Sequence, residues 1–207
     1  MDADGTRPYH HGDLRRALID AAVELIAERG LEATTLREIT RRAGVSHAAP
    51  YHHFADRNAL LEAAAIESFE QLATHLRTAA HRARGDGSAR VRAVIVAYAR
   101  FALDRRARWR LLIEPELVTG PAGTEVARAA QEVHDAVAAT VRSAIGEGSI
   151  RRDADPETMA IAAWSSMHGL TTLATGGLLG GTVTPSRADR AARAVADALL
   201  DGIRVPS

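Results

Sequence analysis

The chain contains 207 residues, and its 26 basic and 26 acidic side chains give a formal net charge of zero. It has no cysteine, which excludes disulfides and thiol chemistry. No signal sequence is indicated. No membrane span is expected either, because the longest weakly polar run, Met159–Val183, contains His168 and five glycines. This run predicts a buried helix with a loop after it. We therefore expect a cytoplasmic protein with one small domain and a larger core of about 140 residues.

The first segment, residues 1–12, is polar and contains Pro8, which predicts a mobile N-terminal arm. A first helix follows, because apolar side chains recur at spacings of three and four and Gly30 stands where the pattern stops. The apolar positions are Leu14, Leu18, Ala21, Ala22, Leu25 and Ile26.

The next segment has the capping and turn residues of a helix-turn-helix. Thr35 and Glu38 form a capping box, so a helix is expected to begin near Leu36. Gly44 can adopt the left-handed conformation that ends this helix, and Ser46 can cap the next one. A helix, a tight turn and a second helix form the unit that many proteins insert into the DNA major groove, although ordinary helical bundles use the same signals.

The second helix of this pair is expected over His47–Phe54. Ala49 and Phe54 can face the core, and the other side is predicted to present polar groups, a small apolar spot and an aromatic hydroxyl. Those outward residues are His47, Ala48, Tyr51 and His52. Asp56 then caps a third helix that opens at Arg57, where a guanidinium can hold a backbone phosphate.

The charge near this unit favours nucleic acid more than the neutral whole chain does. Between Arg37 and Arg57 there are four arginines and three histidines against two carboxylates, Glu38 and Asp56. The local surplus of positive charge is what a phosphate backbone requires.

The remainder of the chain reads as helices separated by glycine and proline breaks, and no strand is indicated. The fold class is therefore all-α, with about nine helices in total. The helices expected after Asp56 cover 57–84, 89–104, 108–117, 124–145, 156–175 and 185–203.

From Asp13 to about Leu61 the sequence resembles the N-terminal domain of the tetracycline-repressor (TetR) family of bacterial transcription regulators. The residues that carry the resemblance are AAVELIAERG, TTLREITRRAGVS and YHHFADRNALL. A weaker similarity, WSSMHG at Trp164–Gly169, looks like the Trp-His-Gly signature of one subgroup's C-terminal domain. The resemblance implies three segments: an arm (1–12), a DNA-binding domain (13–60), and an effector-binding and dimerisation domain (61–207).

Carried over by position, the resemblance implies a set of DNA contacts. They are Thr35, Arg37, Ser46, His47, Ala48, Tyr51, His52, His53 and Arg57. Two residues depart from the family pattern. Pro50 lies early in the recognition helix, where its missing N–H and its ring can distort the turn. Arg57 replaces the usual lysine and keeps the positive charge.

Self-association is expected through the last two helices. A short recognition helix reads few base pairs, and a twofold pair doubles the contacts on a palindromic operator. The resemblance implies a homodimer with a four-helix interface. Small and branched residues on one stripe are expected to form it, although a stripe buried within one chain would look the same: Ala191, Val195, Ala198 and Leu199.

A pocket for a small apolar effector is expected among the middle helices, because aromatic residues are scarce in this chain and gather there. The candidate lining residues are Tyr98, Phe101, Trp109, Leu112, Trp164, Met167 and His168. Trp164 and His168 lie four apart and share a helical face, but the same residues also suit a packed core.

Catalysis and cofactors find no support in the sequence. Ser165, Ser166 and His168 lack the strand-to-helix elbow of a serine nucleophile. No metal-binding histidine pair of the HxxxH or HExxH type occurs, so neither an enzyme, a metal nor a cofactor is expected.

The function expected is a repressor that an effector releases from DNA. Two alternatives remain open. One is a regulator or activator that acts without a ligand, and the other is a helical enzyme or partner-binding module in which the helix-turn-helix is incidental.

Overall fold

The computed structural model describes residues 11–114, 117, 123–178 and 184–202. Within these ranges the chain forms eight α-helices and one short 3-10 helix and contains no β-strand, which confirms the predicted all-α class. The predicted arm lies mostly outside the described residues, and its last two residues, His11 and Gly12, already belong to the first helix.

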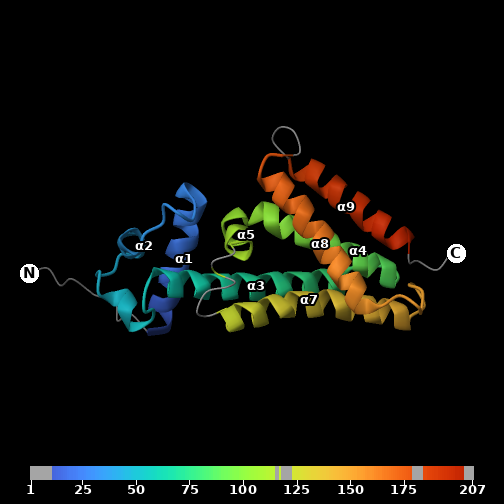
Figure 1. Cartoon of the computed structure of the whole chain (residues 1–207), viewed down its shortest axis with the longest axis horizontal. Coiled ribbons are helices and arrows are strands. Elements are labelled where there is room, and N and C mark those ends of the chain that lie inside the picture. Colours follow the sequence, from blue (N-terminus) through green and yellow to red (C-terminus); the bar gives the residue numbers. More distant parts are fainter. Residues whose placement is uncertain (1–10, 115–116, 118–122, 179–183, 203–207) are drawn as a thin grey trace, which may run out of the picture.

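The N-terminal part consists of α1 (His11–Arg29), α2 (Leu36–Ala43) and the 3-10 helix η1 (Ala49–His52). These elements form the small domain on one side of the molecule in Figure 1. Its core contains most of the apolar positions that the periodicity of the first helix predicted. The buried members on α1 are Leu18, Ile19, Ala21, Ala22, Leu25 and Ile26.

Helix α3 (Arg57–Arg82) belongs to both parts of the molecule and runs from the small domain along the large one (Figure 1). Asp56 caps it as predicted, because its carboxylate accepts a hydrogen bond of 2.8 Å from the Ala59 N–H. The side chains up to Ala65 pack into the N-terminal core, and those from Phe69 onward pack into the larger core. One continuous helix therefore joins the two cores.

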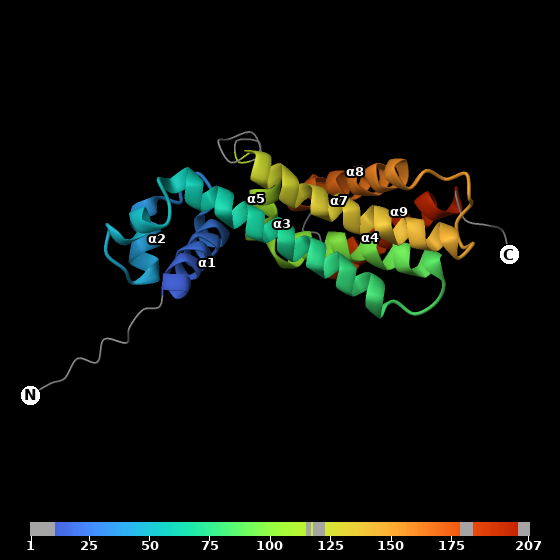
Figure 2. The same ribbon diagram turned by 90° about the horizontal axis from the view of Figure 1, so that it is seen from below.

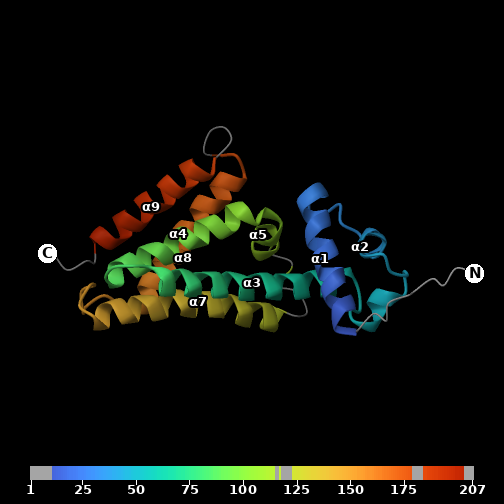
Figure 3. The same cartoon turned by 180° about the vertical axis from the view of Figure 1, so that it is seen from behind.

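The large domain contains the remaining helices together with the later part of α3. They are α4 (Gly87–Asp104), α5 (Arg106–Leu112), α7 (Gly123–Gly146), α8 (Pro156–Thr175) and α9 (Pro185–Asp201). Helix α7 lies alongside α3, as Figures 1 and 2 both show, and α9 lies on the outside against α4 and α8 (Figure 3).

The close approach of α4 to α7 requires glycine at the start of α4. A Cβ atom on Gly87 would lie only 2.5 Å from the Ala144 Cα, so any other residue would push the two helices apart. The Gly87 N–H donates to the Ser149 hydroxyl at 3.0 Å, which ties the same point to the end of α7.

The helix ends agree with the sequence predictions within a few residues, with α5 as the main exception. It was expected over 108–117 but spans Arg106–Leu112. Arg105 adopts a non-helical conformation between α4 and α5 (φ −125°, ψ 54°), and α5 begins directly after it. Helix α9 ends at Asp201, and the predicted end at Ile203 lies outside the described residues. Among the described helices, none has the length and apolar character needed to cross a membrane.

Candidate functional site

The turn between α2 and η1 has the geometry that the sequence predicted. Gly44 is left-handed (φ 70°, ψ 30°), and the Val45 N–H donates to the Thr40 carbonyl at 3.1 Å. At the other end of α2 the capping box is complete, because the Thr35 hydroxyl accepts from the Glu38 N–H and the Glu38 carboxylate accepts from the Thr35 N–H. Both ends of α2 are therefore fixed by local hydrogen bonds.

The recognition segment is shorter than predicted. The sequence suggested an α-helix over His47–Phe54 capped by Ser46, whereas the structure has a 3-10 helix over Ala49–His52 whose N-cap is Ala48, without a side-chain cap. Pro50 provides the reason: it has no N–H to continue an α-helical ladder. Its carbonyl instead accepts from the N–H groups of both His53 and Phe54, each at 2.8 Å.

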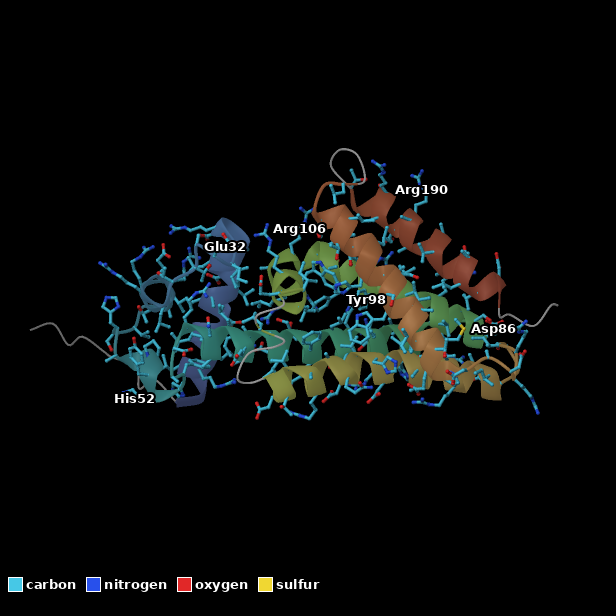
Figure 4. All side chains as sticks on the ribbon, in the orientation of Figure 1. Glu32, His52, Asp86, Tyr98, Arg106 and Arg190 are labelled. Carbon is cyan, nitrogen blue, oxygen red and sulfur yellow. The ribbon has the colours of Figure 1, made fainter. Side chains whose placement is uncertain are left out.

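The outer side of this segment matches the prediction despite the different helix type. His47, Ala48, Tyr51 and His52 are all exposed, Tyr51 at 64%. Figure 4 shows His52 at the tip of the small domain. Pro50 and Phe54 are buried on the opposite side, so the segment presents one face to solvent.

His53 lies differently from its neighbours. Its ring is half-buried with its centroid 6.3 Å from that of Phe54, and its Nε2 is enclosed with no hydrogen-bond partner in the described structure. His53 thus offers less exposed surface for its predicted DNA contact than His47 and His52 do.

The ring of His47 is held by α2. Its Nδ1 lies 3.1 Å from the Thr40 hydroxyl, and that hydroxyl donates its proton to the Arg37 carbonyl at 2.8 Å. A hydroxyl has one proton, so in this arrangement the Nδ1–H donates to the Thr40 oxygen. The contact with Thr40 therefore fixes the orientation of the His47 ring.

The cations around the helix-turn-helix fall into two groups. Arg37 and Arg41 lie four residues apart on α2, are exposed, and make no ion pair with any described residue. Arg42 instead pairs with Glu24 at 3.2 Å and Glu28 at 2.6 Å. The hydrogen bond from Arg42 is also the main reason that the pKa of Glu28 is lowered. Only the first group is open to a phosphate.

Arg57 belongs with the paired group. Its Nε donates to the Thr34 carbonyl at 2.5 Å and its Nη2 to the Leu31 carbonyl at 2.6 Å. The planar fork of the guanidinium thus closes the loop before α2 onto the start of α3. The sequence assigned this residue to a phosphate, but in the structure its donors are directed at the protein's own backbone.

A second candidate site lies inside the large domain, where the structure brings four predicted effector residues together. The Trp164 Nε1–H donates to the Tyr98 hydroxyl at 2.9 Å, and that hydroxyl lies 3.4 Å from the His168 Nδ1. Trp109 packs edge-on against Tyr98 with ring centroids 5.6 Å apart and lies 5.1 Å from the His168 ring. Figure 4 shows Tyr98 between the helices of the large domain.

Burial sets the protonation of this cluster. It raises the pKa of Tyr98, against the smaller opposing effect of the hydrogen bond from Trp164. It also lowers the pKa of His168, so both groups are neutral near pH 7. The Trp109 Nε1 is buried and has no hydrogen-bond partner among the described residues. The other predicted lining residues, Phe101, Leu112 and Met167, are buried in the same core.

An apolar cavity of about 260 Å³ lies beside this cluster, between α4, α8 and α9. Sequence reasoning missed it, because most of its wall consists of alanine and leucine residues from three helices, and no sequence pattern indicates that these residues lie together. Its lining residue Ala99 directly follows Tyr98 on α4, and its lining residue Leu170 follows His168 by two residues on α8. The lining residues are Ala99, Leu103, Leu170, Thr171, Ala174, Arg187, Ala188 and Ala191.

The apolar side chains of α9 divide between two faces. Ala188, Ala192, Ala196 and Leu200 are buried against the rest of the chain. Of the predicted dimer residues, Val195 and Leu199 are half-buried, Ala198 is exposed, and Ala191 lines the cavity. On α8, Ile161 and Leu173 are also exposed, at 57% and 42%.

A helix-turn-helix whose following helix continues into a larger all-helical core defines a two-domain regulator of the DNA-binding class. The chain belongs to the tetracycline-repressor family. Residues 18–64 match the family model described as bacterial regulatory proteins, tetR family, and residues 91–199 match the one described as tetracyclin repressor-like, C-terminal domain.

One curated relative is similar to part of the chain. The chain is 39% identical over 82 residues to the HTH-type transcriptional regulator BetI of Escherichia coli O139:H28, covering 39% of this chain and 42% of that protein. The chain thus matches less than half the length of this curated relative. Such relatives are transcription regulators and not enzymes, in agreement with the sequence.

Two solved structures extend the similarity over the whole fold. A protein of unknown function from Rhodococcus sp. RHA1 is 35% identical, with a TM-score of 0.82 over 96% of this chain and 100% of that one. The fatty acid degradation regulator FadR of Bacillus halodurans has a TM-score of 0.76 over 93% of this chain and 97% of that one. At 15% identity the FadR structure supports the fold alone.

Proposed function

We propose that this protein is a ligand-responsive transcription regulator that binds a palindromic operator as a homodimer and represses transcription until a small apolar effector releases it. The observation that carries the proposal is the exposed face of η1 beside the unpaired Arg37 and Arg41, on a domain joined by α3 to a core with an apolar cavity. Such a protein works in the cytoplasm, on the chromosome.

On DNA, η1 is the element that enters the major groove. Tyr51 and His52 offer polar contacts to base edges, and Ala48 leaves room for a thymine methyl group. The guanidinium groups of Arg37 and Arg41 then reach the phosphate backbone. A four-residue 3-10 helix spans few base pairs, which favours a homodimer that reads two half-sites. The exposed Ile161 and Leu173 of α8 and Ala198 of α9 support that assembly.

Helix α5 is suited to couple the effector core to the DNA-binding domain, because its two sides belong to different cores. Ala107 and Leu111 pack into the N-terminal core, while Trp109 and Leu112 pack into the larger one. Arg108 extends the link, with its guanidinium 3.5 Å from the Asp20 carboxylate and 3.4 Å from that of Glu67. An effector that displaces Trp109 therefore shifts the surface on which α1 and α3 rest.

The energy required for this switch is modest. A hundredfold loss of operator affinity corresponds to about 2.7 kcal/mol of coupling, which must equal the effector's preference for the DNA-free state. An apolar ligand that fits the 260 Å³ cavity only in the DNA-free state buries enough surface there to supply a difference of this size.

A regulator that acts without a ligand is the second candidate. The tight packing of Tyr98, Trp109 and His168 favours it, because a filled core leaves no room at the predicted pocket. The cavity beside that cluster favours the ligand-responsive mechanism. Unchanged operator affinity in the presence of every compound that binds the large domain would decide for the second candidate.

The first test is fluorescence anisotropy of the full chain on labelled duplexes that tile the DNA beside its own gene, at near-physiological salt with unlabelled competitor. Tight binding to one palindromic duplex is expected, with affinity that falls steeply as salt rises. Arg37→Ala and Tyr51→Ala should each weaken it about tenfold without changing thermal stability.

The matched control is Arg190→Ala, which removes the same charge from the exposed side of α9, far from η1 (Figure 4). It should leave operator affinity unchanged. Weak binding that is uniform over all duplexes would contradict the proposed DNA interface, and so would equal losses of operator affinity in Arg37→Ala and Arg190→Ala. Either result would favour the partner-binding alternative.

A further inference from the structure

We infer a second ligand site in the large domain: an arginine-lined groove between α3, α4 and α9 that binds a small phosphate-bearing molecule with an apolar body. The groove has a volume of about 480 Å³, within the range of small-molecule sites. It shares no lining residue with the apolar cavity between α4, α8 and α9.

The charge of the groove is one-sided. Five arginines and no carboxylate line it: Arg82, Arg84, Arg92, Arg100 and Arg193. Two of them are balanced from α9, because Arg92 pairs with Asp197, and the Arg100 Nε donates to Asp189 at 2.7 Å. The other three make no ion pair within 4 Å among the residues that the structure describes.

The floor of the groove is apolar. Ala79 and Ala83 contribute from the α3 side, and Ala93, Val96 and Ala97 from α4. Most of these side chains are alanine, so an aromatic or alicyclic group can lie against them. The floor therefore adds apolar burial to the charge recognition that the arginines supply.

Arg92 adds an unused donor at this wall. Its Nε is buried and has no hydrogen-bond partner within the described part of the chain, even though its Nη2 contacts Asp197. An enclosed donor without an acceptor costs free energy, which is recovered if the Arg92 side chain turns so that its Nε–H reaches an anionic oxygen in the groove.

The position of the groove excludes the operator as its partner. His75, the first residue of its α3 wall, follows Arg57 by 18 residues, which is about 27 Å along the helix. The DNA-binding domain lies at the opposite end of α3 (Figures 1 and 2). The anion that occupies the groove is therefore a separate molecule.

Three guanidinium groups without an ion pair within 4 Å match a phosphate better than a single carboxylate. Arginine binds phosphate oxygens through two parallel N–H donors, and a phosphate ester carries nearly two negative charges near pH 7. A nucleotide has this chemistry together with a planar body for the alanine floor. Because α3 forms one wall, an occupant would also bias the helix that carries the DNA-binding domain; that consequence rests on the proposed function, whereas binding itself does not.

Isothermal titration calorimetry of the full chain without DNA tests the site, with ADP, adenosine and pyrophosphate as probes. ADP should bind at least tenfold more tightly than adenosine, which lacks the charge, and more tightly than pyrophosphate, which lacks the body. Arg193→Gln should weaken ADP about tenfold. Arg190→Gln, three residues earlier on the same helix and outside the groove, should leave ADP binding unchanged.

Each other outcome overturns the inference. No heat with ADP at millimolar concentration removes the site, and equal binding of adenosine removes the role of the arginines. If pyrophosphate binds as tightly as ADP, the groove recognises only the anion. If Arg193→Gln and Arg190→Gln lose ADP affinity equally, ADP binds outside the groove. Operator binding is measured separately, so a failure here leaves the DNA-binding proposal intact.

Discussion

The two domains of this protein use their polar side chains in opposite ways. In the N-terminal domain the residues proposed to act, such as Tyr51 and His52, stand exposed on a short element that local hydrogen bonds position. In the large domain Tyr98, Trp164 and His168 come from two different helices and meet inside the core. A surface that binds DNA can be built from neighbouring residues, whereas an interior site needs helices that are distant in the sequence.

The arginines show the same contrast within a single domain. Arg37 and Arg57 were both predicted to touch DNA, but Arg37 is exposed whereas Arg57 is half-buried. Arg57 lies where two carbonyls of the preceding loop converge, and it stabilises that loop. A positive charge near a recognition element therefore has two possible roles, which only its contacts distinguish.

The largest expected effect concerns the interior site. Trp109→Ala should lower the free energy of unfolding by about 3–5 kcal/mol, because the indole is 1% exposed and its removal leaves a large cavity. Trp109→Phe should cost much less, since the lost Nε1–H has no partner. Urea unfolding followed by circular dichroism measures both. Equal losses in the two variants would mean that the N–H, and not the packing, is what matters.

Arg57→Ala should have the next largest effect, a loss of about 2 kcal/mol in unfolding free energy, because two charge-assisted hydrogen bonds to carbonyls disappear. Arg57→Lys should not restore the loss, since an ammonium cannot present the same planar fork. Thermal unfolding and operator binding should be measured together. A variant that keeps its stability but loses DNA affinity would restore the phosphate contact predicted from the sequence.

The smallest effect is a dependence of stability on pH from His75 and His168. Burial is the main cause of the lowered pKa of both residues, and Arg105 adds to it at His75. The unfolded chain therefore takes up protons at a higher pH than the folded one. These two histidines leave the free energy of unfolding unchanged above about pH 6.5, and they lower it as the pH falls below that value. The Tm should accordingly decrease between pH 7.5 and 5.5.

His168→Asn isolates the contribution of one ring to this dependence. The decrease in Tm between the two pH values should be smaller in the variant than in the natural protein, as followed by differential scanning calorimetry at fixed ionic strength. An identical decrease would place the titrating groups elsewhere in the molecule.

Prediction from sequence succeeded where the signal is local. Thr35, Gly44 and Asp56 each act through backbone atoms within a few residues, so their hydrogen bonds follow from residue type and spacing. The recognition helix is the exception. Pro50 indicated a distortion, but its extent depended on whether Phe54 and Pro50 could both pack into the N-terminal core, which no local rule determines.

The amino-acid sequence by itself determined the all-α class, the helix-turn-helix and the residues on its outer face, because helical periodicity and capping act over one or two turns. The tertiary structure decided which charges are free and where the cavities lie. Arg42 and Arg57 find their partners 14 or more residues away, and the groove with Arg193 forms only where three helices meet. Such contacts depend on how helices pack, and packing follows from the whole chain.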